Sequence, residues 1–426
     1  MRPRLLMLAA LLALSLPSAL GSGAPPARAA ADRPVMAFYY PWYEPGDWSY
    51  AQMSDLPAPT YSGGDDAALR RHIRQADEAG IDALICTWYG PNEPRLNARC
   101  RRLMQLVQES GRGIRVALIP DQSAAFDPAL RTVEGLAAAL AALRRDFATS
   151  PAYFTFRGKP AVFWFNPPSL GGVEDWRRLR ALADPAREQF WFGGTDDFAY
   201  MDVYDTLYDY DITWEGAPGA AMASYAARLA GFNAARGEDR PFVGTVMPGY
   251  DDLKARPDGH RRDRADGAYY RGTWQTVIDR NADAVVLTSF NEFVEGTHIE
   301  PSERYGDLYL RLTREGSQGY HGARPRPHHP AGAAPSRRRG TRCAGASWRT
   351  GRRTAGWRST ATPSATRPPR RWRTAGPTPC STSSASGWST TLRPPRPTTC
   401  SSASSADASS PACRMRPPHP RQPRQA

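Results

Sequence analysis

The chain has 426 residues and a formal net charge of +13, from 55 basic and 42 acidic residues. This positive charge lies in the C-terminal part, because residues 316–426 contain 20 arginines and a single acidic residue, a net charge of +19. Residues 1–315 are therefore net acidic, at −6, and this excludes a basic nucleic-acid-binding surface as the basis of the domain that they contain.

Residues 1–30 have the pattern of a secretory signal peptide. Two arginines precede an apolar run at residues 5–16, and residues 27–29, Ala-Arg-Ala, match a small-x-small cleavage site. The run is shorter than the roughly 20 apolar residues that a membrane span needs. We therefore expect a protein that is secreted or held at the exterior of the cell envelope, without a membrane span.

The C-terminal segment, residues 317–426, is expected to be disordered. It lacks Val, Ile, Phe and Asn, so it contains too little apolar surface to offset the conformational entropy lost on folding. Three interpretations remain open: an arm that binds polyanions, a stalk that spans a cell wall, or a reading frame that has shifted near residue 316. This tail also holds four of the six cysteines. The remaining pair, Cys86 and Cys100, lies on a predicted strand and a predicted helix, and no disulfide framework is expected.

Between these segments, residues 31–316 have the length of one α/β barrel domain. Apolar runs that predict buried strands occur at residues 35–40, 81–87, 114–119, 161–165, 190–192, 208–214, 242–247 and 284–287. Helical patterns occur at residues 65–79, 94–110, 133–147, 173–182, 220–235, 269–280 and 308–313. Strands that alternate with helices predict a parallel sheet, and eight such strands predict a single (β/α)8 TIM barrel.

Aromatic, acidic and amide residues follow the ends of these predicted strands. In a barrel of this kind, the C-terminal ends of the strands carry the active site. Aromatic faces stack on sugar rings, and carboxylates and amides bond sugar hydroxyls. For any single aromatic residue, sealing the barrel mouth is the alternative role, but the collection favours a sugar-binding cleft. The residues expected to bind substrate are Tyr40, Trp42, Trp88, Tyr89, Trp214, Tyr250, Asp251 and Asn291.

Two carboxylates, Glu292 and Glu295, follow the last predicted strand. If this segment turns helically, their three-residue spacing places both on one face. A close pair of carboxyls is what cleavage of a glycosidic bond requires, one as acid and one as base. A solvated acidic loop is the alternative. His72 and His298 lack partners at metal-ligand spacing, and no glycine-rich phosphate loop follows a strand, so neither a metal nor a cofactor is expected.

Four segments together resemble glycoside hydrolase family 99, the endo-α-mannosidases and endo-α-mannanases. They are residues 38–43, 79–91, 248–270 and 288–301. The resemblance implies a (β/α)8 barrel and retaining hydrolysis without a protein nucleophile. In such a mechanism the 2-hydroxyl of the sugar attacks C1, and water then opens the 1,2-anhydro sugar.

Carried over residue by residue, this resemblance implies that Glu292 is the base acting on O2. It implies that Glu295 is the general acid and later the base toward water. Tyr250 and Tyr40 match aromatic residues around the cleaved sugar, and Trp88 matches the aromatic doublet after strand two.

The chain departs from the family pattern at Phe293 and Val294, where the family usually has Trp and His. Both glutamates are retained, but the missing histidine affects the expected leaving-group site. We expect a monomeric hydrolase that cleaves α-mannosidic, mannan-type linkages. The alternatives are a glycan-binding barrel without turnover, or a family-99-like hydrolase that acts on a different polysaccharide.

Overall fold

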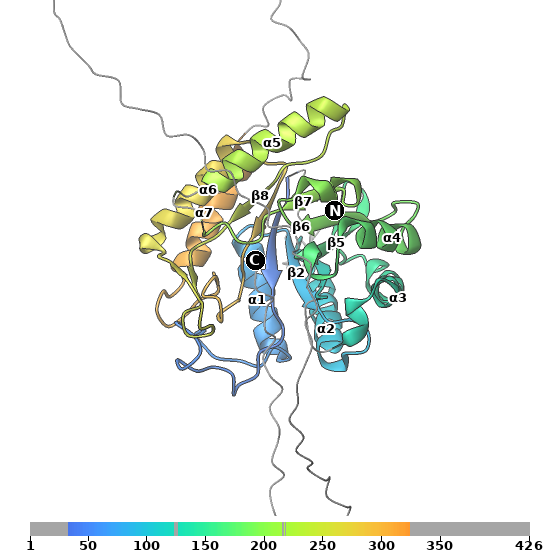
Figure 1. The fold of residues 1–426 in the computed structure, drawn as a ribbon. Coiled ribbons are helices and arrows are strands. Elements are labelled where there is room, and N and C mark those ends of the chain that lie inside the picture. The colour runs from blue at the N-terminus through green and yellow to red at the C-terminus, as the bar shows by residue number, and fades with distance from the viewer. Residues whose placement is uncertain (1–32, 123–126, 215–216, 218, 324–426) are drawn as a thin grey trace, which may run out of the picture. The chain divides into compact units, whose positions relative to one another are not determined.

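A computed structural model describes residues 33–122, 127–214, 217 and 219–323. Eight parallel strands form a nearly closed barrel with helices on its outside (Figure 1). The strands are β1 (Val35–Tyr39), β2 (Ala83–Trp88), β3 (Arg115–Pro120), β5 (Lys159–Phe165), β6 (Phe190–Gly194), β7 (Thr206–Tyr208), β8 (Val243–Val246) and β11 (Ala284–Leu287). Their order is β7-β6-β5-β3-β2-β1-β11-β8. The predicted (β/α)8 barrel is confirmed.

The helices lie close to the predicted ranges. They are α1 (Asp66–Glu78), α2 (Pro94–Ser110), α3 (Val133–Leu143), α4 (Val173–Ala183), α5 (Ala220–Arg236), α6 (Ala268–Asp279) and α7 (Leu308–Gly322). The bounds of α2 match the prediction because its ends carry strong local signals. The Glu93 carboxylate accepts a hydrogen bond from the Leu96 amide, Pro94 occupies the first turn, and Gly111 ends the helix in a left-handed conformation.

Alternation of side chains along the strands separates two apolar layers. In β1, Val35, Ala37 and Tyr39 pack against the helices. Met36 and Phe38 fill the barrel interior together with Tyr40, the residue after the strand. Because successive side chains point to opposite faces of a strand, this parity decides which residues reach the barrel mouth.

The sixth strand was predicted at residues 208–214, but the structure places it earlier in the chain. The strand observed there, β7, covers Thr206–Tyr208, so Tyr210 and Trp214 lie in the loop that follows it. Asp209 and Asp211 interrupt the apolar run, and the chain leaves the sheet there. β7 and β8 are the two ends of the strand order. The Thr206 hydroxyl of β7 donates to the carbonyl of Pro241, just before β8, at 2.7 Å, and this bond connects the two ends.

The last helix is longer than predicted. It reaches Gly322, and its Ser317 hydroxyl donates to the Ala79 carbonyl at 2.8 Å. Tyr320 is fully buried and donates to the Ala282 carbonyl at 2.7 Å, while the Arg33 guanidinium covers its ring at 4.1 Å. The folded part therefore extends past the expected boundary at residue 316. The expectations for residues 1–30 and for the tail beyond residue 323 lie outside the described residues.

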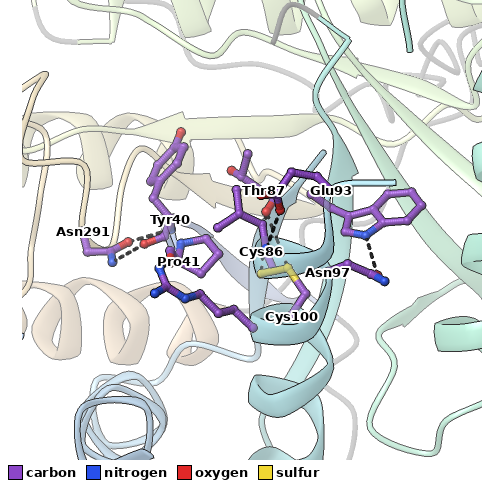
Figure 2. The surroundings of a disulfide bond; sticks show 11 residues. Tyr40, Pro41, Cys86, Thr87, Glu93, Asn97, Cys100 and Asn291 are labelled. Carbon is purple, nitrogen blue, oxygen red and sulfur yellow. Dashed lines mark hydrogen bonds between the residues drawn. A yellow bond between two sulfur atoms is a disulfide. The ribbon is translucent and has the colours of Figure 1, made fainter. Parts of the chain in front are cut away.

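A disulfide bond joins Cys86 on β2 to Cys100 on α2, with the Cα atoms 6.3 Å apart (Figure 2). This bond was not expected from the sequence, in which the two cysteines indicated no disulfide framework. Both cysteines belong to the apolar layer between barrel and helices, and packing of α2 on β2 brings them together. None of the helices in the described residues is long and apolar enough to cross a membrane.

Removing this disulfide should destabilise the barrel. The bond closes a loop between residues 14 apart in sequence, for which the chain-entropy model predicts about 3 kcal/mol. We expect the double variant Cys86→Ala/Cys100→Ala to unfold at lower urea concentration than the parent. Dithiothreitol should lower the midpoint of the parent but leave that of the variant unchanged. If the unfolding midpoint of the parent were the same with and without dithiothreitol, this prediction would be contradicted.

Candidate active site

Both predicted glutamates lie buried in the segment that follows β11. Glu292 is 3% exposed and Glu295 is 5% exposed. The Glu292 amide donates to the Ser289 hydroxyl at 2.8 Å, and the Gly296 amide donates to the Phe293 carbonyl at 3.2 Å. Gly296 has a φ of +60°, and this left-handed conformation closes the turn that places both acids in the barrel mouth.

The Glu292 carboxylate is held by Tyr43. The tyrosine hydroxyl donates to Glu292 Oε1 at 2.9 Å and accepts from the Phe293 amide at 3.0 Å. Burial, followed by the neighbouring charge of Glu295, raises the pKa of Glu292 to about 8. Tyr43 was not among the predicted site residues, although it belongs to the aromatic segment after β1.

Glu295 forms an ion pair with Arg256, with 2.7 Å between Oε1 and Nη2. Burial raises the pKa of Glu295, and the charge of Arg256 opposes that rise. Arg256 also pairs with Asp252 and donates to the Tyr250 hydroxyl at 2.7 Å. Sequence reasoning missed Arg256, because a single arginine in a loop after a strand carries no distinguishing pattern.

A single cation therefore sits beside one member of a buried pair of acids. Arg256 stabilises the ionised form of Glu295, and that negative charge in turn disfavours ionisation of Glu292. Since two adjacent buried carboxylates do not both ionise freely, Arg256 favours the arrangement in which Glu292 holds the proton of a singly protonated pair. A carboxylic acid and a carboxylate are thus available in one site.

Two tyrosine hydroxyls lie in the field of both acids. The hydroxyls of Tyr40 and Tyr210 are hydrogen-bonded to each other. Burial is the main cause that raises the pKa of each phenol, and the charges of Glu292 and Glu295 add to it in both cases. The two acids therefore converge on one region of the mouth. Tyr210 was missed because it was expected inside a strand.

Asn291 links the segment that carries the two acids to the segment after β1. Its side chain is fully buried; Oδ1 accepts from the Tyr40 amide at 2.8 Å, and Nδ2 donates to the Tyr40 carbonyl at 2.9 Å (Figure 2). Nδ2 also donates to the Tyr61 hydroxyl at 3.1 Å. Because every polar atom of its amide is bonded within the protein, we infer a positioning role for Asn291. Its predicted contact with substrate stays a prediction.

A buried polar network continues beneath Asn291. The Tyr61 hydroxyl donates to Glu300 Oε2 at 2.8 Å, and His72 Nε2 lies 2.8 Å from the other oxygen of Glu300. His72 Nδ1 lies 2.9 Å from the Tyr39 hydroxyl. His72 on α1 thus supports the loops that carry Tyr40 and Glu292 from the helix side.

Trp88, Tyr89 and Trp42 have different places in the structure. Trp88 is fully buried, and its indole donates to Asn97 Oδ1 at 3.0 Å and packs edge-on against Phe147. Strand parity turns this side chain toward the helices, so the structure does not bring Trp88 together with the two acids. Its contact with substrate stays a prediction. Tyr89, the next residue, stacks with Trp42 at 6.3 Å between ring centroids. Trp42 also packs on Tyr40 at 4.5 Å, so these three residues line one wall of the mouth.

Tyr250 and Asp251, in the segment after β8, form β9 and pair with β10 (Arg261–Arg262). Tyr250 is mostly buried, and its hydroxyl donates to Asp252 at 3.2 Å. The Asp251 amide donates to the Glu295 carbonyl at 2.8 Å, so Asp251 supports the turn that carries both acids through its backbone. Trp214 is 64% exposed at the outer rim.

Phe293 occupies the position where the sequence departs from the family pattern. It is fully buried and stacks on His298, with 3.9 Å between ring centroids. His298 Nε2 lies 3.2 Å from Asp55, and Arg264 donates to the His298 carbonyl at 2.8 Å. Burial lowers the pKa of His298 to about 4, so this ring is neutral and acts in packing. The described residues contain no group of three His, Cys, Asp or Glu side chains arranged to hold a metal.

Comparison with known proteins places this geometry in a family. The sequence model of Glycosyl hydrolase family 99 matches residues 45–309. The chain belongs to this family. It is 26% identical over 291 residues to the glycoprotein endo-alpha-1,2-mannosidase-like protein of Homo sapiens, covering 61% of this chain and 63% of that protein. It is 21% identical over 301 residues to glycoprotein endo-alpha-1,2-mannosidase of Rattus norvegicus, covering 61% and 62%. The chain thus spans less than two thirds of these relatives.

A solved structure has the same fold. The family 99 endo-alpha-mannosidase from Bacteroides thetaiotaomicron in complex with BIS-TRIS propane superposes with a TM-score of 0.60 at 23% identity. The match covers 69% of this chain and 99% of that chain. The likeness extends over the whole barrel of that enzyme.

The raised pKa of Glu292 predicts a pH-dependent stability. Between its ordinary pKa of 4.5 in the unfolded chain and about 8 in the folded protein, the folded state binds the additional proton. The stability from this group is therefore complete below pH 4.5 and is lost as pH rises through 8. The free energy of unfolding of the parent, measured with urea, should fall across this window by up to about 1.4 kcal/mol per pH unit. Glu292→Gln should remove this pH dependence. Parallel pH profiles for parent and variant would contradict the assignment. Glu315→Gln, at an exposed carboxyl on α7, is the control.

Proposed function

We propose that the protein is a secreted, retaining glycoside hydrolase that cleaves α-mannosidic linkages in mannan-type polysaccharide. The observation that carries the proposal is the buried, electrostatically coupled pair Glu292 and Glu295 in the mouth of a family 99 barrel. The relatives, endo-alpha-1,2-mannosidase and an endo-alpha-mannosidase, support mannose as the sugar. The solvated acidic loop considered as an alternative does not fit the burial of the two acids.

In the proposed reaction, Glu292 removes the proton from O2 of the sugar at the cleaved bond. O2 attacks C1, the C1–O bond to the leaving group breaks, and Glu295 gives its proton to the departing oxygen. The product of this step is a 1,2-anhydro sugar. Glu295, now ionised, takes a proton from water, which attacks C1, and O2 recovers its proton from Glu292. Two displacements at C1 give net retention of configuration, and both carboxyls return to their starting states.

The resting position of the proton constrains this mechanism. The roles require a carboxylate at Glu292 and a carboxylic acid at Glu295, whereas Arg256 favours the reverse arrangement in the free protein. Transfer of one proton between the two carboxyls interconverts the arrangements without a change in net charge. Activity should therefore follow the singly protonated pair and give a bell-shaped pH–rate profile whose limbs belong to the pair as a unit.

Aromatic residues near the acids support a sugar as the ligand. Tyr40, Trp42 and Tyr89 pack together after β1 and β2, and Tyr250 follows β8. Aromatic faces of this kind suit the C–H surfaces of pyranose rings. With Phe293 buried against His298 and Val294 beside it, the turn between the two acids presents no imidazole. The leaving-group side is therefore less polar than the usual family sequence provides.

Export to an oxidising compartment is part of the proposal. It rests on the pattern in residues 1–30, and the Cys86–Cys100 disulfide adds support, because such bonds persist mainly outside the reducing cytosol.

Substitution of each glutamate tests the proposed roles. Glu292→Gln and Glu295→Gln should each lower kcat/KM on an α-mannan oligosaccharide by about 100-fold or more. On an α-mannosyl disaccharide with a nitrophenolate leaving group, bond cleavage needs no acid. Glu295→Gln should therefore lose less in the first step on this substrate, measured as the burst of nitrophenolate, whereas Glu292→Gln should lose as much as on the oligosaccharide. Glu315→Gln should match the parent.

Two results would overturn the assignment. If either variant kept activity within a few-fold of the parent on both substrates, that glutamate would not have its proposed role. If the parent bound mannan oligosaccharides in calorimetry but released no product after long incubation, the barrel would be a glycan-binding module without turnover.

A further inference from the structure

Three rings stack in a row from the buried wall of the mouth to the surface. The Tyr250 ring lies parallel to the His260 ring, with centroids 4.2 Å apart and an interplanar angle of 14°. On its other side, His260 stacks on Trp214 at 3.8 Å and 27°. Exposure rises along the row from mostly buried Tyr250 to Trp214, which is 64% exposed.

This row is anchored at its middle. The His260 amide donates to Asp252 Oδ1 at 2.8 Å, and His260 Nε2 lies 2.8 Å from the Thr213 hydroxyl. The Thr213 carbonyl accepts from Nε and Nη2 of Arg262, at 3.0 and 2.9 Å. Thr213, the residue before Trp214, and His260, the ring beneath it, are therefore both held in place. A ligand that binds to Trp214 would thus lose little free energy to the ordering of side chains.

The row is also continuous with the two acids. The Tyr250 hydroxyl accepts a hydrogen bond from Arg256, and Arg256 forms the ion pair with Glu295. Trp214 therefore lies farther from the acids than Tyr250, with the His260 ring between them. Because His260 covers one face of the indole, the large exposed surface of Trp214 belongs to its other face and its edge.

We propose that Trp214 is the platform of an outer subsite that binds a neutral hexose ring of the same polysaccharide chain. This inference rests on the proposed function. A flat, apolar face held rigidly at the rim matches the C–H face of a pyranose. Pairs of aromatic rings contribute on the order of 0.5–1.5 kcal/mol beyond the area that they bury, and we take this range as the scale for a pyranose on the indole. The site would favour substrates long enough to extend from the acids to Trp214, and would make cleavage dependent on chain length.

A series of α-mannan oligosaccharides of increasing length tests the subsite. For the parent, kcat/KM should rise with length up to the oligomer that reaches Trp214. Trp214→Ala should lower the ratio of kcat/KM for the longest oligomer to that for the shortest by roughly 2- to 13-fold, the range that 0.5–1.5 kcal/mol corresponds to. Trp214→Phe keeps an aromatic face and should restore part of the ratio. Leu182→Ala is the matched control, because Leu182 is 56% exposed on α4, away from the row.

The same oligosaccharides separate failure of the subsite from failure of the hydrolase. Calorimetric titration of the parent and of Trp214→Ala measures the affinity for the longest and the shortest oligomer without requiring turnover. Tight binding that depends on Trp214 and on length, with no product, would support the subsite and reject the hydrolase. Turnover with the same length dependence in parent and Trp214→Ala would support the hydrolase and reject the subsite. Equal affinity of both proteins for the longest oligomer would reject it as well.

Discussion

Two carboxyl groups buried side by side cannot both be charged without compensation, and the mouth of this barrel supplies only partial compensation. Arg256 pairs with Glu295, while the Glu292 carboxylate accepts hydrogen bonds from neutral donors, the Tyr43 hydroxyl and the Val294 amide. The surrounding phenols Tyr40 and Tyr210 remain neutral because burial and both acids raise their pKa values. The site thus holds one proton that two groups can share, which is the prerequisite for acid and base catalysis in a single pocket.

The barrel makes this arrangement rigid by tying the first strand to the last. β1 and β11 are hydrogen-bonded neighbours, and beyond their ends the Asn291 amide continues the pairing by bonding both backbone groups of Tyr40. Tyr61, Glu300 and His72 extend this support from the loop to α1. Each carboxyl therefore sits on a turn whose polar groups are bonded within the protein, and such preorganisation spares the protein from reorganising when charge develops during the reaction.

Much of the fold could be predicted because its signals are local. Buried parallel strands appear as continuous apolar runs, and α2 shows both of its ends in the sequence through Glu93 and Gly111. β7 could not be placed, because its three residues are too short to stand out from the polar chain around them. The full length of α7 could not be predicted, because its second half, residues 314–322, is polar apart from the buried Tyr320.

The placement of site residues could be predicted where sequence position determines geometry, but not where packing does. Glu292 and Glu295 lie together because both follow one strand end. The burial of Trp88 toward the helices could not be foreseen, because an aromatic doublet does not show which of its two members faces the mouth. Asn291 was expected to meet substrate, but its amide bonds only the protein. The role of Arg256 could not be predicted, because its contact with Glu295 depends on the conformation of the β8–α6 connection.

The configuration of the first product tests the central claim most directly. Hydrolysis of an α-mannan oligosaccharide can be followed by proton NMR from the first minutes, before mutarotation equilibrates the new reducing end. Two displacements at C1 predict that the α anomer appears first and the β anomer only later, as mutarotation proceeds. Initial release of the β anomer would show a single displacement by water and would contradict the shared-proton mechanism of Glu292 and Glu295.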